Sequence, residues 1–334
     1  MPTRPVLITG AAGFIGSHTA EALLRAGRRV VGLDNFDPFY DESLKRANLA
    51  EVAATARRSP DGQFEFIEGD INDRASMRAL FERFKPSGLI HLAARAGVRP
   101  SIADPAGYAH TNVTGTSVLL DQCAAAGAAA GIERIVIASS SSVYGTIGAG
   151  ETPRPFSEEQ SVERPISPYA ATKRACELIG FTHHHLTQQP VAMLRFFTVF
   201  GPRQRPDLAI RLFLTKIARG EPIRLFGEGS TSRDYTFIDD IVGGVLAAYE
   251  KIPSHGYRIW NLGNSHPVTL DHMVETIARV VGKPANATRA EAQAGDVRAT
   301  WAEPERAAAE LGFRAKTSFE DGVRKQWEWL RTRL

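Results

Sequence analysis

The first 200 residues alternate between short apolar runs and longer amphipathic stretches, and this alternation restricts the possible folds more than any other feature of the chain. The apolar runs are five to seven residues long and apolar nearly throughout, as expected of strands buried on both faces. They are PVLIT, RRVVGLD, FEFIEGD, GLIHLAA, RIVIAS and VAMLRFF. Between them, helical patterns occupy roughly residues 15–27, 73–84, 104–129 and 167–188. Strands and helices in this order predict an α/β fold with a Rossmann-type, doubly wound parallel sheet.

After about residue 200 the regular alternation of apolar runs and helical stretches ends. Gly201 and Pro202 precede the loop RQRPD, a helix that begins at Leu208, and then shorter strands and helices. A chain of 334 residues, 43% of them hydrophobic, is large enough for two cores. We therefore predict a sheet domain over residues 1–200 and a smaller mixed lobe over 201–334, with chain segments that cross between them.

Composition argues against several classes of partner. The net charge is +3 and the basic residues are scattered, so we expect no nucleic-acid partner. The sequence has neither a signal peptide nor an apolar run of 18 residues, which predicts no membrane span and a cytoplasmic location. Cys123 and Cys176 lie within helical patterns and are expected to be buried thiols. The adjacent histidines of THHHL point in different directions around a helix, so we expect no metal site.

The first strand runs directly into the motif TGAAGFIGSH. Gly10, Gly13 and Gly16 lead into a helix, and Phe14 and Ile15, which lie between the last two glycines, are further predicted cofactor contacts. Glycines allow the tight turn that brings a phosphate close to backbone N–H groups at the positive end of a helix dipole. At the end of the second strand stands Asp34, whose carboxylate can accept both ribose hydroxyls of an adenosine and would repel a 2′-phosphate. This combination predicts a site for NAD rather than NADP.

Further cofactor contacts are expected where later strands end. The predicted residues are Asn35, Asp70, Ile71, Leu92, Ala93 and Ala94. Asp70 and Ile71 follow the third strand and are placed to meet the adenine. The string HLAA ends the next strand in small residues, as a wall beside a cofactor requires.

The motif PYAATKRACE places Tyr169 and Lys173 four residues apart, on one face of a helix. A phenol is a weak base at neutral pH, but a neighbouring ammonium stabilises the phenolate. An isolated Tyr-x-x-x-Lys is common by chance. Here it follows a serine-rich strand, IASSSSVYG, in a chain with a predicted NAD site. Tyr169 is therefore the predicted catalytic base, and Lys173 supports it and can hold the nicotinamide ribose.

Together these motifs resemble the extended short-chain dehydrogenases/reductases, a superfamily of NAD-dependent enzymes. Within it, the chain is especially similar to the UDP-glucuronate 4-epimerases. The strings that carry this similarity are DNFDPFYDESLKRANL, HLAARAGVRPS, SSSSVYG, RFFTVFGPRQRPD and RDYTFIDDI. The resemblance covers most of the chain and implies a catalytic NAD-binding domain followed by a nucleotide-sugar lobe.

The resemblance also implies roles for individual residues. Ser140 takes the place of the superfamily's catalytic serine or threonine. Where related dehydratases and decarboxylases carry carboxylates, this chain has Ser141 and Ser142, and where enzymes for neutral sugars commonly carry Asn it has Thr198. We hypothesise that these last three residues hold a substrate carboxylate and so prevent loss of CO2. Three arginines match positions near the uronate or the UDP phosphates: Arg205, Arg233 and Arg298.

The implied reaction is C4 epimerisation of UDP-glucuronate to UDP-galacturonate through a transient 4-keto sugar, with a tightly bound NAD recycled in each turnover. Two enzymatic alternatives remain: a 4-epimerase of the UDP-glucose type and a UDP-glucuronate decarboxylase. A non-catalytic NAD-binding sensor is a third, but it would be expected to lose Tyr169 or Lys173. In relatives, the helices at about 104–126 and 167–188 form a four-helix bundle across a two-fold axis, which implies a homodimer.

Overall fold

The computed structural model describes residues 4–146, 153–227, 229, 231–291 and 299–334. Proximity of Cα atoms groups the chain into two compact units. The first comprises Met1–Val143, Val162–Arg195 and Val242–Trp260. The second comprises Tyr144–Ser161, Phe196–Ile241 and Asn261–Leu334. Neither unit is a continuous stretch of sequence.

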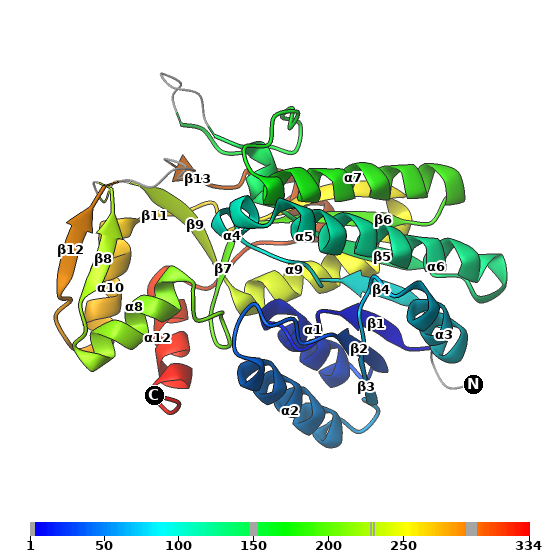
Figure 1. The fold of residues 1–334 in the computed structure, drawn as a ribbon, viewed down its shortest axis with the longest axis horizontal. Coiled ribbons are helices and arrows are strands. Elements are labelled where there is room, and N and C mark those ends of the chain that lie inside the picture. Colours follow the sequence, from blue (N-terminus) through cyan, green and yellow to red (C-terminus); the bar gives the residue numbers. More distant parts are fainter. Residues whose placement is uncertain (1–3, 147–152, 228, 230, 292–298) are drawn as a thin grey trace. The chain divides into compact units, whose positions relative to one another are not determined.

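The first unit is built on a seven-stranded sheet with the order β10-β6-β5-β4-β1-β2-β3 (Figure 1). Its strands are β1 (Val6–Thr9), β2 (Val30–Asp34), β3 (Phe64–Glu68), β4 (Gly88–His91), β5 (Arg134–Ser140), β6 (Val191–Phe196) and β10 (Tyr257–Leu262). Strand β1 pairs in parallel with β2 on one side and with β4 on the other. The pairs β2–β3 and β4–β5 are parallel as well. The predicted Rossmann-type sheet is confirmed, and every predicted apolar run contains a strand.

Helices connect these strands. They are α1 (Phe14–Arg25), α2 (Glu42–Arg58), α3 (Arg74–Phe84), α4 (Val98–Ala103), α5 (Pro105–Ala109), a π-helical turn η1 (His110–Thr114), α6 (Gly115–Ala130), a 3-10 turn η2 (Ser141–Tyr144), α7 (Pro168–Thr187), α9 (Ile238–Lys251) and a 3-10 turn η3 (Ile252–Ser254). The four predicted helical patterns are confirmed, although the third consists of α5, η1 and α6. The prediction omitted α2, because three of the four residues that this helix buries are polar: Lys45, Asn48 and Thr55.

The core on one face of this sheet fixes the helices that carry the site. Strand residues such as Leu7, Leu89 and Ile135 pack with Met77 of α3, Val118 of α6 and Cys176 of α7. Full burial of such an apolar side chain contributes about 1.5–3 kcal/mol. Cys176 and Cys123 are buried free thiols, as predicted. Within the described ranges, no helix is both long and apolar enough to cross a membrane.

The second unit is smaller and mixed. Its central strand, β9 (Ser232–Phe237), pairs in parallel with β7 (Thr198–Phe200) and β13 (Ala299–Thr300) and antiparallel with β11 (Pro267–Thr269). A separate two-stranded sheet joins β8 (Ile223–Phe226) and β12 (Ala287–Ala290). The helices are α8 (Ala209–Arg219), α10 (Leu270–Val281), α11 (Glu305–Leu311) and α12 (Phe319–Leu330). The helix predicted to begin at Leu208 is α8, with Leu208 as its N-cap.

Candidate active site

The glycine loop between β1 and α1 depends on residues without a side chain. Gly10 has φ +71, in the left-handed region that favours glycine, and a Cβ there would lie 2.7 Å from the Ala93 nitrogen. A Cβ on Gly16 would overlap the carbonyl of Gly10. The loop therefore brings the backbone of β1, α1 and the segment after β4 closer together than any other residues would permit.

The N-terminus of α1 has no side-chain cap. Its N-cap, Gly13, makes no side-chain capping bond, and the first turn contains no acidic residue. The first N–H groups of a helix have no partner within the helix and lie at the positive end of its dipole. This end of α1 fits the diphosphate of a dinucleotide.

Asp34 is oriented toward this loop from the end of β2. One carboxylate oxygen accepts a hydrogen bond from the Ala12 nitrogen at 3.1 Å, and the other accepts one from the Phe36 nitrogen at 2.9 Å. Burial raises the pKa of the Asp34 carboxyl above its usual range. The hydrogen bond from Phe36, the charge of Lys45 and the hydrogen bond from Ala12 lower this pKa, but they do not offset the effect of burial. Each carboxylate oxygen retains a further lone pair, so the group can accept two ribose hydroxyls.

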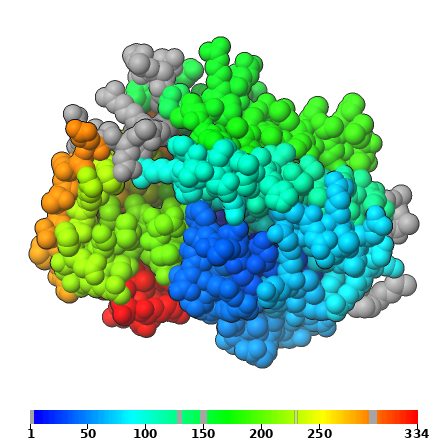
Figure 2. Space-filling model, in the orientation of Figure 1, coloured from blue at the N-terminus to red at the C-terminus, as the bar shows by residue number. Residues whose placement is uncertain are grey.

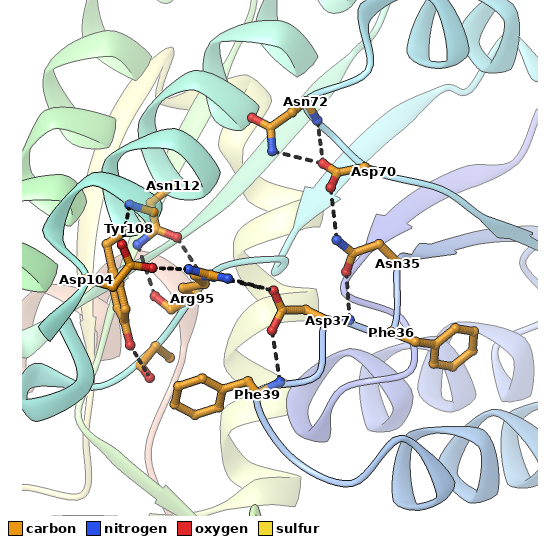
Figure 3. A network of polar contacts seen from close by, with 12 residues as sticks. Asn35, Phe36, Asp37, Phe39, Asp70, Asn72, Arg95, Asp104, Tyr108 and Asn112 are labelled. Carbon is orange, nitrogen blue, oxygen red and sulfur yellow. Dashed lines mark hydrogen bonds and ion pairs between the residues drawn. The ribbon is translucent and has the colours of Figure 1, made fainter.

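The other predicted cofactor residues lie at the same edge of the sheet, where parallel strands end together. The Asn35 amide donates to Asp70 at 3.1 Å, which links the loops after β2 and β3 (Figure 3). Ile71 is buried. After β4, the nitrogens of Leu92 and Ala93 donate to the backbone carbonyl and the hydroxyl of Thr9, at 3.2 and 3.3 Å. Ala94 follows them, only partly exposed.

The serine-rich end of β5 forms a tight hydroxyl cluster. Ser140 is the last residue of the strand, and Ser141 and Ser142 begin the 3-10 turn η2. The Ser140 hydroxyl donates to the Ser142 hydroxyl and accepts from the Ser142 nitrogen, both at 3.1 Å. Such local bonds bend the chain away from the strand direction.

Helix α7 carries Tyr169 and Lys173 one turn apart. Ser167 caps the helix by accepting from the Ala170 nitrogen at 3.1 Å. Lys173 is 4% exposed, and its ammonium donates to the carbonyl of Ala138 at 2.8 Å. Lys173 is thus attached to β5 two residues before Ser140, which places all three predicted catalytic residues at the junction of β5 and α7.

Asn112 is a site residue that the sequence prediction missed. It lies in the π-helical turn η1, where its side-chain oxygen accepts from the Arg95 nitrogen at 2.8 Å. Its amide nitrogen donates to the Arg95 carbonyl and to the Thr172 hydroxyl, both at 3.0 Å. Asn112 therefore joins the loop after β4 to the helix that carries Tyr169. The signal in sequence is weak, because π-helical segments are rare and mostly only one turn long.

His91 is a second residue that the prediction did not single out. Its ring lies between the hydroxyls of Thr9 and Thr116, at 2.6 and 3.0 Å. Burial, with the nearby charge of Lys173, lowers its pKa to about 3. His91 is consequently neutral at physiological pH.

Four further residues were predicted to contact the sugar nucleotide, and the structure describes the contacts of three of them. In the second unit, Thr198 begins β7 and is in register with Tyr235 of β9. Arg205 forms an ion pair with Asp207 at 2.8 Å, and Arg233 donates to the Ser232 carbonyl at 2.8 Å. Arg298 lies outside the described residues.

The THHHL histidines have polar contacts at the end of α7. His183 bonds the side chain of Gln189 at 2.7 Å, and His184 bonds the Gln189 carbonyl at 2.8 Å. In the part of the chain that the structure describes, no three metal-ligating side chains come together.

Comparison with known proteins adds an independent line of evidence. The family model described as GDP-mannose 4,6 dehydratase matches residues 7–326. UDP-glucuronate 4-epimerase of Thermodesulfobacterium geofontis is 39% identical over 97% of this chain and 95% of its own length. UDP-glucuronate 4-epimerase 3 of Arabidopsis thaliana is 42% identical over 97% of this chain and 76% of its own length.

A solved structure has the same fold over nearly its whole length. The crystal structure of UDP-glucuronic acid 4-epimerase from Bacillus cereus, in complex with UDP-glucuronic acid and NAD, superimposes with a TM-score of 0.89. The two chains are 31% identical, and the match covers 99% of this chain and 100% of that one.

Proposed function

The chain belongs to the GDP-mannose 4,6-dehydratase family, and we propose that within this family it interconverts UDP-glucuronate and UDP-galacturonate at C4 with NAD as cofactor. The observation that carries this proposal is the full-length similarity to UDP-glucuronate 4-epimerases. The local chemistry agrees with it. Ser141 and Ser142 follow Ser140 with no carboxylate to promote dehydration or decarboxylation.

The residues of the first unit suit NAD. The uncapped end of α1 takes the diphosphate, and Asp34 takes the adenosine ribose. Bound there, NAD supplies a hydride acceptor that also returns the hydride.

We assign the proton chemistry to Tyr169. Its phenolate removes the proton of the C4 hydroxyl and returns it to the 4-keto oxygen, while Ser140 holds that oxygen by a hydrogen bond. Lys173, fixed by the Ala138 carbonyl, supports Tyr169 in this role and can hold the nicotinamide ribose. No proton is consumed over the cycle, since the same group gives back what it took.

We further propose that hydroxyls hold the uronate carboxylate, because a neutral donor adds no acid or base that would assist loss of CO2. Ser141 and Ser142 are the donors in the first unit. The assignments of Thr198 to the carboxylate, and of Arg205, Arg233 and Arg298 to the uronate or the UDP phosphates, stay predictions.

The test is incubation of the purified protein with UDP-glucuronate and no added NAD, followed by chromatography and NMR of the products. The proposal predicts UDP-galacturonate. UDP-xylose or a 4-keto pentose would indicate a decarboxylase instead. Turnover of UDP-glucose with none of UDP-glucuronate would indicate a neutral-sugar 4-epimerase, and the absence of any turnover would leave a binding protein.

We propose a homodimer through α6 and α7, because α7 lies at the surface (Figure 2) and three of its apolar side chains are exposed. Leu178, Phe181 and Leu186 are 52%, 51% and 75% exposed. Phe181→Asp should convert a dimer to a monomer in light scattering, and a wild-type monomer would refute the proposal. A cytoplasmic location, with which the two free thiols agree, stays a prediction.

A further inference from the structure

An ion pair joins the two loops on either side of the glycine loop. Strand β1, which leads into Gly10, lies between β2 and β4, and Thr9 is in register with Leu33 on one side and with His91 on the other. The loop after β2 contains Asp37, and the loop after β4 contains Arg95. A bond between these two side chains therefore passes from one neighbour of β1 to the other.

The Arg95 guanidinium makes this connection (Figure 3). Its Nε and Nη2 atoms lie 3.3 and 3.4 Å from one carboxylate oxygen of Asp37. Its Nη1 atom donates to Asp104 at 2.5 Å. The side chains of Arg95 and Asp37 are 30% and 27% exposed, so the pair is half-shielded from water.

Both partners make further hydrogen bonds that hold their loops. Asn112, itself 1% exposed, bonds the nitrogen and the carbonyl of Arg95. The second carboxylate oxygen of Asp37 accepts from the Phe39 nitrogen at 3.0 Å, and the Asp37 carbonyl accepts from Lys45. Little loop entropy is therefore lost when the ion pair forms.

We propose that the Arg95–Asp37 pair is a clasp over the dinucleotide site, which must open before NAD leaves. This inference rests on the proposed use of NAD, and it identifies two positioning residues that retain the cofactor between turnovers. A cycle with no net redox change benefits from such retention, because the cofactor never needs to be exchanged.

The test is the rate of NAD release from the holoenzyme, measured by exchange with radiolabelled NAD in the absence of any sugar nucleotide. Asp37→Asn and Arg95→Gln should each raise the dissociation rate about threefold to fivefold, the range expected for a partly exposed pair. The double variant should release NAD no faster than Arg95→Gln alone, because Arg95→Gln already removes the bond to Asp37 and, in addition, the bond to Asp104. Salt should accelerate release from the wild type more than from the variants.

The matched control is Arg74→Gln, which removes an ion pair with Asp121 between α3 and α6 on the same unit, at 2.8 Å. Its release rate should equal that of the wild type. Asp37→Asn keeps an oxygen for the Phe39 nitrogen, so the loop retains its turn.

Two results would overturn the clasp. Unchanged release rates in both single variants would show that the pair does not hold NAD. Faster release in Arg95→Gln with slower release in Asp37→Asn would instead make Arg95 a direct ligand of the cofactor phosphates, competed for by Asp37. Because no sugar is present, these results do not depend on which sugar nucleotide the enzyme epimerises.

Discussion

The ammonium of Lys173 donates a 2.8 Å hydrogen bond to the carbonyl of Ala138, and this bond attaches the second turn of α7 to the end of β5. Ser140 lies two residues beyond the acceptor, and Tyr169 lies one turn before the donor. The serine, tyrosine and lysine that the sequence suggests as a catalytic set are thus held by two rigid elements rather than by loops.

Tyr169→Phe removes the proposed proton acceptor without changing the ring. Turnover of UDP-glucuronate should fall about 10²- to 10⁴-fold, the usual contribution of a positioned general base. NAD measured in the purified protein should stay at the wild-type level. Ser140→Ala should also reduce turnover while leaving NAD bound.

A matched control for that experiment is Tyr257→Phe. The Tyr257 hydroxyl donates to the backbone carbonyl of Glu177 at 2.9 Å, so its loss should lower stability and spare turnover. Full activity in Tyr169→Phe would refute the assignment of the base.

Gly10→Ala should abolish NAD binding. The new methyl group would meet the backbone of Ala93 at a φ of +71, so the glycine loop must move away from the segment after β4. Gly243→Ala is the control, because a Cβ on that residue of α9 has open space around it. We expect Gly243→Ala to bind NAD normally and to gain up to about 1 kcal/mol of stability, as measured by calorimetry and urea denaturation. Normal NAD content in Gly10→Ala would contradict the proposed cofactor site.

Asp34 should decide the choice between NAD and NADP. Asp34→Ala removes the acceptor of the ribose hydroxyls and the charge that opposes a 2′-phosphate, so the ratio of the NADP and NAD dissociation constants should fall about tenfold or more.

The same residue predicts a pH dependence. Because burial raises the pKa of Asp34, the protonated carboxyl stabilises the folded state at pH values below the usual aspartate pKa. This contribution to the free energy of unfolding is lost as the pH rises through the raised pKa. Comparison of NAD-free wild type with Asp34→Asn by urea denaturation across this window isolates the effect. Identical pH profiles would show that Asp34 is not perturbed.

Glu177 should be a large contributor to the stability of the first unit. It is fully buried with Arg195, at 2.8 Å, and it accepts from Ser139. Burial alone would raise its pKa, but the hydrogen bonds and charge of Arg195, together with Ser139 and Arg174, hold the pKa below its usual range. Its contribution is therefore present above the usual glutamate range and is lost as the pH falls through the lowered value.

Glu177→Gln leaves Arg195 buried without its counter-charge and should cost about 3–5 kcal/mol in urea denaturation. Asp121→Asn breaks an exposed pair and should cost less than about 1 kcal/mol. Equal losses of stability in the two variants would show that the buried Glu177–Arg195 pair contributes no more to folding than an exposed pair does.

The sheet could be predicted because each central strand is apolar on both faces. The glycine loop could be predicted because its residues follow β1 directly. Helix α2 could not be predicted, because it buries Lys45 and Asn48 and lacks an apolar stripe. The pairing of Arg95 with Asp37 could not be predicted either. It joins residues 58 positions apart, through a loop geometry that depends on Asn112 in a π-helical turn.

The return of the same hydride to C4 can be measured directly with UDP-glucuronate that carries deuterium at C4. The holoenzyme is incubated with it in ordinary water, with excess unlabelled NADH. We predict UDP-galacturonate that retains the deuterium at C4, because the same hydride leaves and returns within a single site while Tyr169 transfers only the hydroxyl proton. Product with hydrogen at C4, from either the solvent or the added NADH, would contradict it.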